Sequence, residues 1–368
     1  MDGVITDPAL LPIREKVLAK ERLSLEDGVT LYRSADLLGV GWLANVVRER
    51  ISGSAAYYVL NRHINPTNVC VASCKLCAFG RPEGVAGAYT YTLDEIFERA
   101  RPAPGRRYSE LHIVGGHHPT LTLDHYLAMV RGLKERYPEV HVKAFTMAEI
   151  LYFAQISGLA TREVLIAFKD AGLDTMPGGG AEIFAPKTRA RIARGKCTGD
   201  EWLAIAREAH ELGIPTNATM LYGHVETIED RVDHLCRLRD LQDATSGFLA
   251  FIPLAFHPPN TGMSRLPFTG GILDLANIAV SRLMLDNFPH VKAYWIMIGE
   301  KLAQVALSFG ADDVDGTVVE EKIYHDAGAP TSEELTKAEL ERLIRDAGRV
   351  PVERDALYRP ALREPALV

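Results

Sequence analysis

The feature that most constrains the fold is an alternation of short apolar or β-branched runs with longer amphipathic segments, which begins near residue 60. The amphipathic segments, such as LDHYLAMVRGLKERY and EWLAIAREAHELG, repeat apolar residues every three or four positions, as surface helices do. Strands that alternate with helices form a parallel sheet, either open and doubly wound or closed into a barrel. The runs that predict strands are RHINPTNV, ELHIVGG, HVKAFT, LDTMPGG, IPTNATMLY, GFLAFIPLAF and HVKAYWIMI.

The number of these runs favours a barrel. Seven strands, with a possible eighth near Asp312 to Gly316, fit a complete or partial TIM-type (β/α) barrel. No glycine-rich dinucleotide fingerprint follows the first strand, which counts against a Rossmann domain. We therefore expect an α/β protein with an N-terminal helical lead-in at 1–58, a barrel at 59–328, and a C-terminal helix and tail at 329–368 packed on the barrel.

Charge and hydropathy exclude several classes of partner. The formal net charge is -7 and no long run of Lys and Arg occurs, so neither a nucleic acid nor an anionic membrane surface is indicated. The N-terminal segment MDGVITDPALLPIREKVLAK has no uninterrupted apolar core of a secretory signal. The apolar run FLAFIPLAF contains a proline and is too short to span a bilayer. We expect a cytoplasmic protein without a membrane partner.

Three of the five cysteines lie in the octapeptide CVASCKLC, at Cys70, Cys74 and Cys77. The octapeptide follows the first predicted strand, which places it at the barrel face where active-site loops gather. A structural zinc ion needs a fourth ligand at conventional spacing, but Cys197 and Cys236 are isolated. Inert buried cysteines rarely cluster in this way. The third interpretation is a [4Fe–4S] cluster with one iron free of protein ligands, and such an iron implies chemistry there.

The C-x-x-x-C-x-x-C pattern after the first strand resembles the signature of the radical S-adenosylmethionine superfamily. In that family S-adenosylmethionine chelates the free iron, and one electron from the cluster cleaves it to methionine and a 5'-deoxyadenosyl radical. The resemblance implies that Cys70, Cys74 and Cys77 hold a [4Fe–4S] cluster and that S-adenosylmethionine is a co-substrate. The family usually has an aromatic residue before the third cysteine, and Leu76 stands there in this chain.

The segment ELHIVGGHHP resembles the family's Gly-Gly-Glu motif at the end of the second strand, whose carbonyls hold the methionine amino group. The resemblance implies this backbone role for Gly115 and Gly116 only, because His117 replaces the glutamate. His117 is a candidate catalytic proton donor, and both His117 and His118 are candidate substrate contacts. The structural alternative is that they are turn histidines beside Pro119.

In PGGGAEIF, a glycine run precedes a helical pattern. By resemblance, Glu182 binds the ribose hydroxyls or the amino group of S-adenosylmethionine. The alternative is a glutamate in the first helical turn, where it complements the helix dipole. Lys196 or Arg189 is a candidate for the methionine carboxylate, or else a surface charge.

The segment ATMLYGHVE resembles the family's fifth-strand motif for the adenine, which implies cofactor contacts for Tyr222 and Gly223. Asn217 and Thr219 share one face of this strand, because side chains alternate. Polar residues on an inward barrel face are costly unless they are satisfied, so we expect Asn217 to bind substrate and Thr219 to bind the cofactor. His257 ends the sixth predicted strand and is a candidate for catalysis and for a substrate carboxylate.

A more specific resemblance spans roughly residues 60 to 358. The chain is similar to the futalosine-pathway enzymes of menaquinone biosynthesis, and also to the synthase that forms the deazaflavin chromophore of coenzyme F420. The segments that carry this likeness are RHINPTNVCVASCKLCAF, ELHIVGGHHP, PGGGAEIF, TNATMLYGHVE, QDATSGFLAFIPLAFHP, GADDVDGTVVEE and GRVPVERDALY.

Within this group the chain is most similar to the aminofutalosine-forming enzymes. The resemblance implies that the 5'-deoxyadenosyl radical adds to the enol ether of 3-[(1-carboxyvinyl)oxy]benzoate. The adduct then rearranges onto the ring and loses carbon dioxide to give aminofutalosine. A reducing electron donor such as flavodoxin or ferredoxin is implied. The alternatives are the cyclic dehypoxanthine futalosine synthases, a deazaflavin-forming synthase, and an electron-transfer protein that only carries the cluster.

A carbon radical attacks what lies nearest, so the alkene must be held in contact and water kept out. We expect an apolar lumen, with FLAFIPLAF and AYWIMI as walls and few polar anchors. Arg62, Asn217 and His257 are the candidates for the two substrate carboxylates, on the basis of strand position and polarity.

Overall fold

The computed structural model describes residues 4–361, which contain nine β-strands. Every ladder between these strands is parallel. The strands are β1 (Ala55–Val59), β2 (Asn61–Ile64), β3 (Glu110–Ile113), β4 (His141–Ala144), β5 (Thr216–Tyr222), β6 (Phe248–Ala255), β7 (His290–Val291), β8 (Asp313–Gly316) and β9 (Val350–Arg354).

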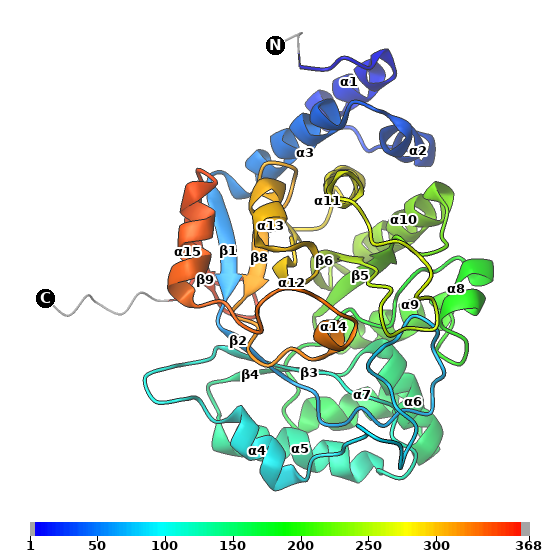
Figure 1. Ribbon diagram of the computed structural model, residues 1–368, viewed down its shortest axis with the longest axis vertical. Helices are drawn as coiled ribbons and strands as arrows, with labels where there is room; N and C mark the ends of the chain where they lie inside the picture. Colours follow the sequence, from blue (N-terminus) through cyan, green and yellow to red (C-terminus); the bar gives the residue numbers. More distant parts are fainter. Residues whose placement is uncertain (1–3, 362–368) are drawn as a thin grey trace, which may run out of the picture.

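Helices precede, connect and follow the strands (Figure 1). They are a short 3₁₀ helix at Pro8–Leu10 and α1 (Leu11–Ala19), α2 (Leu25–Arg33), α3 (Leu37–Ser52), α4 (Leu93–Ala100), α5 (Leu123–Arg136), α6 (Met147–Ser157), α7 (Thr161–Asp170), α8 (Pro186–Ile192), α9 (Gly199–Glu211), α10 (Ile228–Thr245), α11 (Gly271–Met284), α12 (Trp295–Ile298), α13 (Glu300–Ala306), α14 (Ile323–Asp326) and α15 (Lys337–Asp346).

The strand pairings run around a closed barrel. The ladders form three sheets with the orders β8-β1-β9, β2-β3-β4 and β5-β6-β7. Isolated parallel bridges join these sheets, namely Lys143 with Thr175, Met176 with Thr216, Lys292 with Asp313, and Arg62 with Val319. Because β1 and β2 are consecutive segments of one path, separated by Leu60, the circuit returns to its start. The expected TIM-type barrel is confirmed, and it is closed.

Two predicted strands are shorter than the sequence pattern indicates. The run LDTMPGG contributes only the bridges of Thr175 and Met176. The run HVKAYWIMI forms β7 and then turns into the helix α12, so its second half is not a strand. The Trp295 indole Nε1 donates a hydrogen bond to the Gly316 carbonyl at 2.9 Å, which fixes this helix against β8. The possible eighth strand near Asp312 is confirmed as β8.

Two strands lie where only helices or an irregular tail are predicted. β1 falls in the expected helical lead-in, and β9 falls in the C-terminal tail. β9 pairs with the side of β1 opposite to β8, at the edge of its sheet. An edge position tolerates Pro351, which has no backbone N–H to donate. β9 therefore extends the sheet beyond the barrel circuit.

The remaining helices frame the barrel. α3 packs against α11, and α15 packs against β9, as Figure 1 shows at the upper and left edges of the molecule. α15 begins at the Thr336 cap, whose hydroxyl accepts from the Glu339 N–H, and the Glu339 carboxylate returns to the Thr336 N–H. Within residues 4–361 no single helix has the length and apolarity to cross a membrane. Helices α6 and α7 have the required length and apolarity only when they are taken together, and their axes are bent by 104°.

Candidate active site

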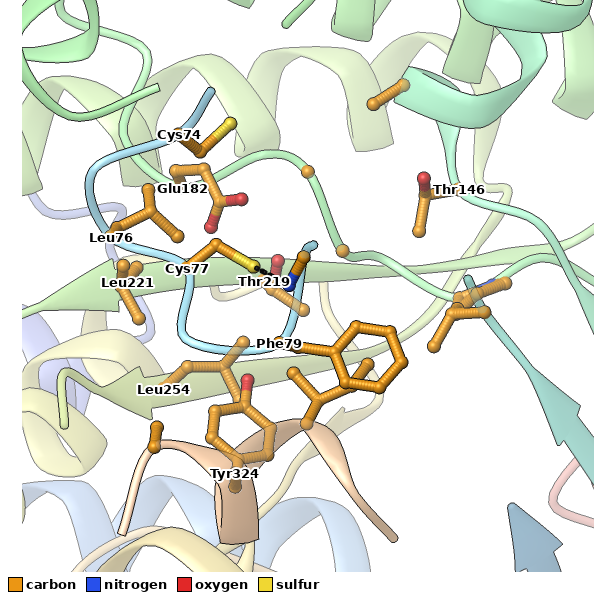
Figure 2. Close-up of a pocket in the computed structure, with 18 of the residues that line it drawn as sticks. Cys74, Leu76, Cys77, Phe79, Thr146, Glu182, Thr219, Leu221, Leu254 and Tyr324 are labelled. Atoms are coloured by element: carbon orange, nitrogen blue, oxygen red, sulfur yellow. Dashed lines mark hydrogen bonds between the residues drawn. The ribbon is translucent and has the colours of Figure 1, made fainter. Parts of the chain in front are cut away.

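A cavity of about 250 Å³ opens among the loops at the carboxyl ends of the strands. It is bounded by the loop that follows β2, by the ends of β3, β5, β6 and β8, and by α14. Figure 2 shows Cys77, Glu182 and Thr219 around this space, with Tyr324 of α14 beside it. The carboxyl end of a parallel barrel is the face where active sites form.

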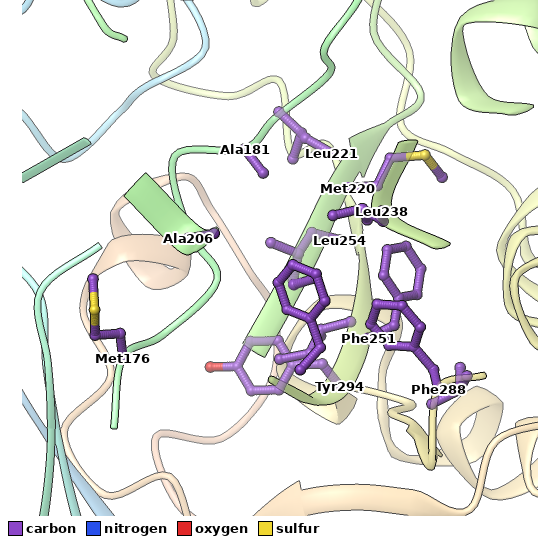
Figure 3. Packing of buried hydrophobic residues seen from close by; sticks show 14 of the residues in the cluster. Met176, Ala181, Ala206, Met220, Leu221, Leu238, Phe251, Leu254, Phe288 and Tyr294 are labelled. Atoms are coloured by element: carbon purple, nitrogen blue, oxygen red, sulfur yellow. The ribbon is translucent and has the colours of Figure 1, made fainter. Parts of the chain in front are cut away.

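The two sides of the cavity differ in polarity. Leu221 of β5 and Leu254 of β6 contribute to an apolar wall, while the alternate residues Met220 and Phe251 point away and pack outside the barrel (Figure 3). The opposite wall carries polar side chains, among them His63 of β2, His112 of β3 and Asp315 of β8. The expectation of an apolar lumen is therefore right for the β5–β6 wall and wrong for the wall formed by β2, β3 and β8.

The three cysteines of the octapeptide all line the cavity. The Val71 N–H donates to the His117 carbonyl at 3.0 Å, which pins the cysteine loop to the end of β3. A side chain at Gly116 would place its Cβ 2.2 Å from the Val69 carbonyl oxygen and 3.0 Å from the Cys70 Cβ. Only glycine allows this approach, so the Gly-Gly pair serves the packing of the cysteine loop directly.

The donor set fits an iron–sulfur cluster. The Gly80 N–H donates to the Cys77 Sγ at 3.3 Å, a contact of the kind that tunes cluster potentials (Figure 2). Burial raises the pKa of the Cys74 thiol to about 11, so its thiolate needs a positive partner. Among residues 4–361 no three His, Cys, Asp or Glu side chains converge closely enough for a single metal ion. An iron–sulfur cluster binds each thiolate at a separate iron, so its ligands need not converge on one point.

A largely buried ion pair faces the cysteines. The Lys196 Nζ lies 2.8 Å from the Glu182 Oε1, and both residues line the cavity. Burial opposes the charge of each group, but the attraction between them outweighs it, so the pKa of Glu182 is lowered and that of Lys196 is raised. The thiols of Cys74 and Cys77 also raise the pKa of Lys196. A carboxylate and an ammonium at this position suit the amino and carboxylate groups of an amino acid ligand.

Glu182 is held in an unusual backbone conformation. Its φ is 49°, in the left-handed region that side chains rarely occupy, and its carbonyl accepts the Leu221 N–H at 2.7 Å. Such strain persists where the surroundings over-determine it, often at functional sites. Because α8 begins only at Pro186, Glu182 precedes the helix, and the first-turn alternative is wrong.

Arg189 does not reach the cavity. Its guanidinium is buried and donates to the carbonyls of Cys197 and Gly180, both at 2.7 Å. These bonds hold the loop that precedes α8, and Arg189 is neither a surface charge nor a cavity residue. Of the two cations considered for the methionine carboxylate, the structure brings only Lys196 to the cavity.

His117 and His118 differ in their surroundings. His117 lines the cavity and stacks on Tyr152, with 4.6 Å between ring centroids. Burial, with a smaller contribution from Lys196, lowers the pKa of His117 to about 4, so the ring is neutral near pH 7. The His118 Nδ1 instead accepts the N–H groups of Thr120 and Leu121, as a turn histidine does.

Glu149 is a residue of the site that was not among the candidates from the sequence. Its Oε1 accepts the Gly115 N–H at 3.0 Å, and its Oε2 accepts the Thr146 N–H at 2.7 Å in the capping box of α6. Glu149 therefore connects the end of β3 to the start of α6 at the edge of the cavity. The T-x-x-E pattern at 146–149 predicts the cap but not the contact with Gly115.

Thr219 and His257 line the cavity, as their candidate roles require. The Thr219 hydroxyl has no free proton to donate to a ligand, because it already donates to the Gly178 carbonyl at 2.7 Å. The His257 Nε2 lies 2.9 Å from the Met297 carbonyl, which only accepts, so Nε2 carries the proton in the neutral ring. Its Nδ1 is then an acceptor, and it is buried without a partner in the described chain.

Four other candidates do not line the cavity. Arg62 pairs with Glu320 at 2.7 Å. Tyr222 points out of the barrel, where its hydroxyl donates to Asp274 at 2.9 Å. Asn217 faces the lumen two positions before Thr219 and lies deeper than the cavity. At Gly223 a Cβ would lie 2.1 Å from the Thr269 Cγ2, so this glycine serves packing. Cavity residues that strand position alone did not single out are His63, His112, Asp315, Glu321, Tyr294 and Tyr324.

Comparison with known families divides the chain into two matches. Residues 64–237 match the model of the radical SAM superfamily, and residues 245–365 match the model described as the CofH/MqnC C-terminal region. The first match contains the three cysteines, Glu182 and Lys196.

Characterised relatives are similar over nearly the whole chain. The aminodeoxyfutalosine synthase of Thermus thermophilus is 54% identical over 361 residues, which cover 96% of each chain. The 5-amino-6-(D-ribitylamino)uracil–L-tyrosine 4-hydroxyphenyl transferase of Methanosphaerula palustris is 42% identical and covers 92% of this chain and 94% of its own. Among solved structures, methylornithine synthase superposes with a TM-score of 0.70 at 17% identity, over 92% of this chain and 97% of its own, which shows a shared fold.

Proposed function

The chain belongs to the radical S-adenosylmethionine superfamily, whose members use a [4Fe–4S] cluster and S-adenosylmethionine, and from this premise we propose that it is an aminodeoxyfutalosine synthase. The proposed reaction joins the 5'-deoxyadenosyl group of S-adenosylmethionine to 3-[(1-carboxyvinyl)oxy]benzoate. The products are aminofutalosine (aminodeoxyfutalosine), methionine and carbon dioxide. The observation that carries this proposal is the 54% identity, over 96% of both chains, to the Thermus thermophilus enzyme of that name.

The proposed roles of the residues follow from their positions. Cys70, Cys74 and Cys77 hold the cluster, which supplies the electron that cleaves S-adenosylmethionine. Lys196 binds the methionine carboxylate and Glu182 the amino group or ribose hydroxyls, because their ion pair faces the thiols. For this, the two side chains exchange part of their contact with each other for contacts with the ligand.

The proposed reaction requires a site that excludes water, and the apolar wall formed by β5 and β6 supports this requirement. His117 is neutral and can exchange one hydrogen bond with substrate or product. His257, with Nε2 held by Met297, offers only an acceptor at Nδ1 while it is neutral. We therefore propose that His257 accepts a hydrogen bond and does not serve as a neutral donor to a carboxylate.

The proposed electron donor is a small low-potential carrier such as flavodoxin or ferredoxin in the cytoplasm. Support comes from the cysteine loop, in which Val71, Ser73 and Lys75 are exposed at the surface. A donor that contacts this loop approaches the cluster ligands within a few residues of the chain.

The test is an anaerobic reaction with reconstituted protein, S-adenosylmethionine and a strong reductant, analysed by mass spectrometry. With 3-[(1-carboxyvinyl)oxy]benzoate we expect aminofutalosine. A parallel reaction with tyrosine and 5-amino-6-(D-ribitylamino)uracil tests the second activity, which the 42% identical relative suggests. Product in the second reaction alone would replace the proposed function with that of the transferase, and no 5'-deoxyadenosyl product in either would refute both.

A further inference from the structure

The lumen contains, in the cavity wall and below it, a set of charged side chains that neutralise one another. Lys143 lies 2.6 Å from Glu110, and Lys292 lies 3.4 Å from Asp315. Arg354, which enters from β9, lies 2.7 Å from Asp313. All of these groups are buried. Each carboxylate thus has a cation of its own, and the set carries no net charge.

The acidic residues at the rim of the cavity are also compensated. Glu321 accepts the N–H groups of Ile323 and Tyr324 and pairs with His325 at 3.3 Å. The hydrogen bond to Glu321 raises the pKa of His325 to about 9, so His325 is protonated near pH 7. Glu182 pairs with Lys196. A negatively charged ligand that enters the cavity therefore meets Glu182 and Glu321 already paired with cations. The Glu149 carboxylate has no such partner, but it accepts two backbone N–H groups, and burial raises its pKa.

Two histidines on the polar wall differ from these paired groups, because neither ring makes a hydrogen bond within residues 4–361. His63 and His112 occupy paired positions in β2 and β3, and their rings stack with 4.5 Å between centroids and 3° between planes. His63 is 7% exposed, its Nε2 is buried without a partner, and both rings line the cavity. The nearest acid to His112 is Glu110, 4.0 Å from Nδ1.

Both rings are neutral near pH 7, because burial lowers the pKa of His63 and of His112. A neutral imidazole carries one N–H, and an unpaired N–H in a buried wall is costly. In the tautomer that carries the proton on the unpartnered Nε2, a ligand relieves this cost when it presents an acceptor oxygen to the wall. His63 differs here from His257, whose proton is already engaged by the Met297 carbonyl.

The depth of the two rings in the barrel determines which part of a bound ligand they contact. They lie within β2 and β3, deeper in the barrel than the cysteine loop and Gly115, which follow those strands. The end of the co-substrate that reacts with S-adenosylmethionine must lie near the cysteines. The opposite end then reaches the histidines.

We propose that His63, with His112 stacked beside it, donates a hydrogen bond to the ring carboxylate of the aromatic co-substrate and thereby directs the enol ether toward the cysteine loop. This assignment rests on the proposed function, since it names that co-substrate. The vinyl carboxylate, which is lost in the reaction, stays at the other end of the cavity. The two histidines thus select co-substrates that carry an anionic group remote from the alkene.

The experiment compares two co-substrates in three forms of the holoenzyme. One co-substrate is 3-[(1-carboxyvinyl)oxy]benzoate, and the other is 2-phenoxyacrylate, which lacks only the ring carboxylate. The forms are the wild type, His63→Phe, which keeps a stacking ring but no donor, and His63→Gln, which keeps an N–H donor. For a charge-assisted hydrogen bond, kcat/KM for the carboxylated co-substrate is expected to fall about 10- to 100-fold in His63→Phe. The value for 2-phenoxyacrylate is expected to change less than about twofold, and His63→Gln is expected to lie between.

The control is His141→Gln. His141 is a half-buried histidine of β4 that bonds to the Thr175 hydroxyl and does not line the cavity, so its substitution should change kcat/KM for both co-substrates by the same factor. Iron content and 5'-deoxyadenosine formed without co-substrate report the integrity of each variant. If His63→Phe fails to fold, the comparison between wild type and His63→Gln decides.

The outcomes separate this assignment from the proposed function. An equal loss with both co-substrates in the His63 variants would overturn the assignment and leave the proposed function in place. A wild type that forms aminofutalosine but shows no preference for the carboxylated co-substrate would also overturn it. A wild type that forms no aminofutalosine would refute the proposed function, and the assignment with it.

Discussion

Substitution of Lys196 by Met removes one partner of the buried pair with Glu182. The two atoms lie 2.8 Å apart, and the side chains are 19% and 9% exposed. Loss of one partner of a fully buried pair costs about 3–5 kcal/mol, because the other charge is left uncompensated. Since Lys196 borders the cavity, we take the lower end, about 3 kcal/mol, which corresponds to a fall in Tm of roughly 4 °C for a chain of 368 residues.

The assay is thermal unfolding of Lys196→Met, Glu182→Gln and the double variant at several pH values. The double variant should lose less stability than the sum of the single variants, because it leaves no buried charge unpaired. Arg162→Met provides a control. The Arg162–Glu211 pair is also 2.8 Å long, but its side chains are 46% and 50% exposed, so a loss below about 1 kcal/mol is expected.

The dependence of the free energy of unfolding on pH tests the same pair. Lys196 lowers the pKa of Glu182 in the folded protein, so the pair stabilises above the unfolded pKa of about 4.5, and this stabilisation is lost as pH falls through the folded pKa. Without Lys196, burial raises the pKa of Glu182, and protonation then removes the unpaired charge. The stability that Lys196→Met loses relative to the wild type should therefore become smaller as the pH falls from 8 to 5. The reasoning would be refuted if the stability loss of Lys196→Met were the same at every pH and the loss of the double variant equalled the sum of the two single losses.

Three further outcomes are expected. Alanine at Cys70, Cys74 or Cys77 should abolish both cluster iron and 5'-deoxyadenosine formation, whereas Cys236→Ala, outside the cavity, should retain both by iron analysis and chromatography. Gly116→Ala should lower cluster iron by displacing the cysteine loop, while Gly270→Ala, where a side chain meets open space, should retain the wild-type iron content. Replacement of His325 by Gln should lower stability by about 1 kcal/mol at pH 6. The hydrogen bond to Glu321 raises the pKa of His325 to about 9, so its stabilisation is present below pH 6.5 and lost as pH rises through 9, and unfolding curves of the two proteins should coincide at pH 10.

The barrel could be predicted because its strands and helices have different periods. The run IPTNATMLY and the segment EWLAIAREAHELG show these periods clearly and become β5 and α9. The structure of the run AYWIMI could not be predicted in this way, because an apolar stretch that is buried on all sides shows no period. Its helix is stabilised by a tertiary contact of Trp295. β9 was missed because the strand with which it pairs, β1, is almost 300 residues away in the chain.

The site could be predicted only where local spacing carries the chemistry. The cysteine ligands could be predicted from spacing alone. Arg62 was chosen for its strand position and polarity, but its charge is already balanced by Glu320, which is distant in the sequence. His63 and His112 look like ordinary strand residues, and only the pairing of β2 with β3 brings their rings together. Partners distant in the sequence decide whether a polar strand residue is free to bind a ligand.

The most direct test of the account uses S-adenosylmethionine labelled with ¹³C at the adenosyl 5' carbon. The labelled compound is incubated anaerobically with reduced holoenzyme and 3-[(1-carboxyvinyl)oxy]benzoate, and the products are examined by mass spectrometry and NMR. The account predicts aminofutalosine in which the labelled carbon is bonded to a carbon from the co-substrate. Label found only in free 5'-deoxyadenosine would contradict it.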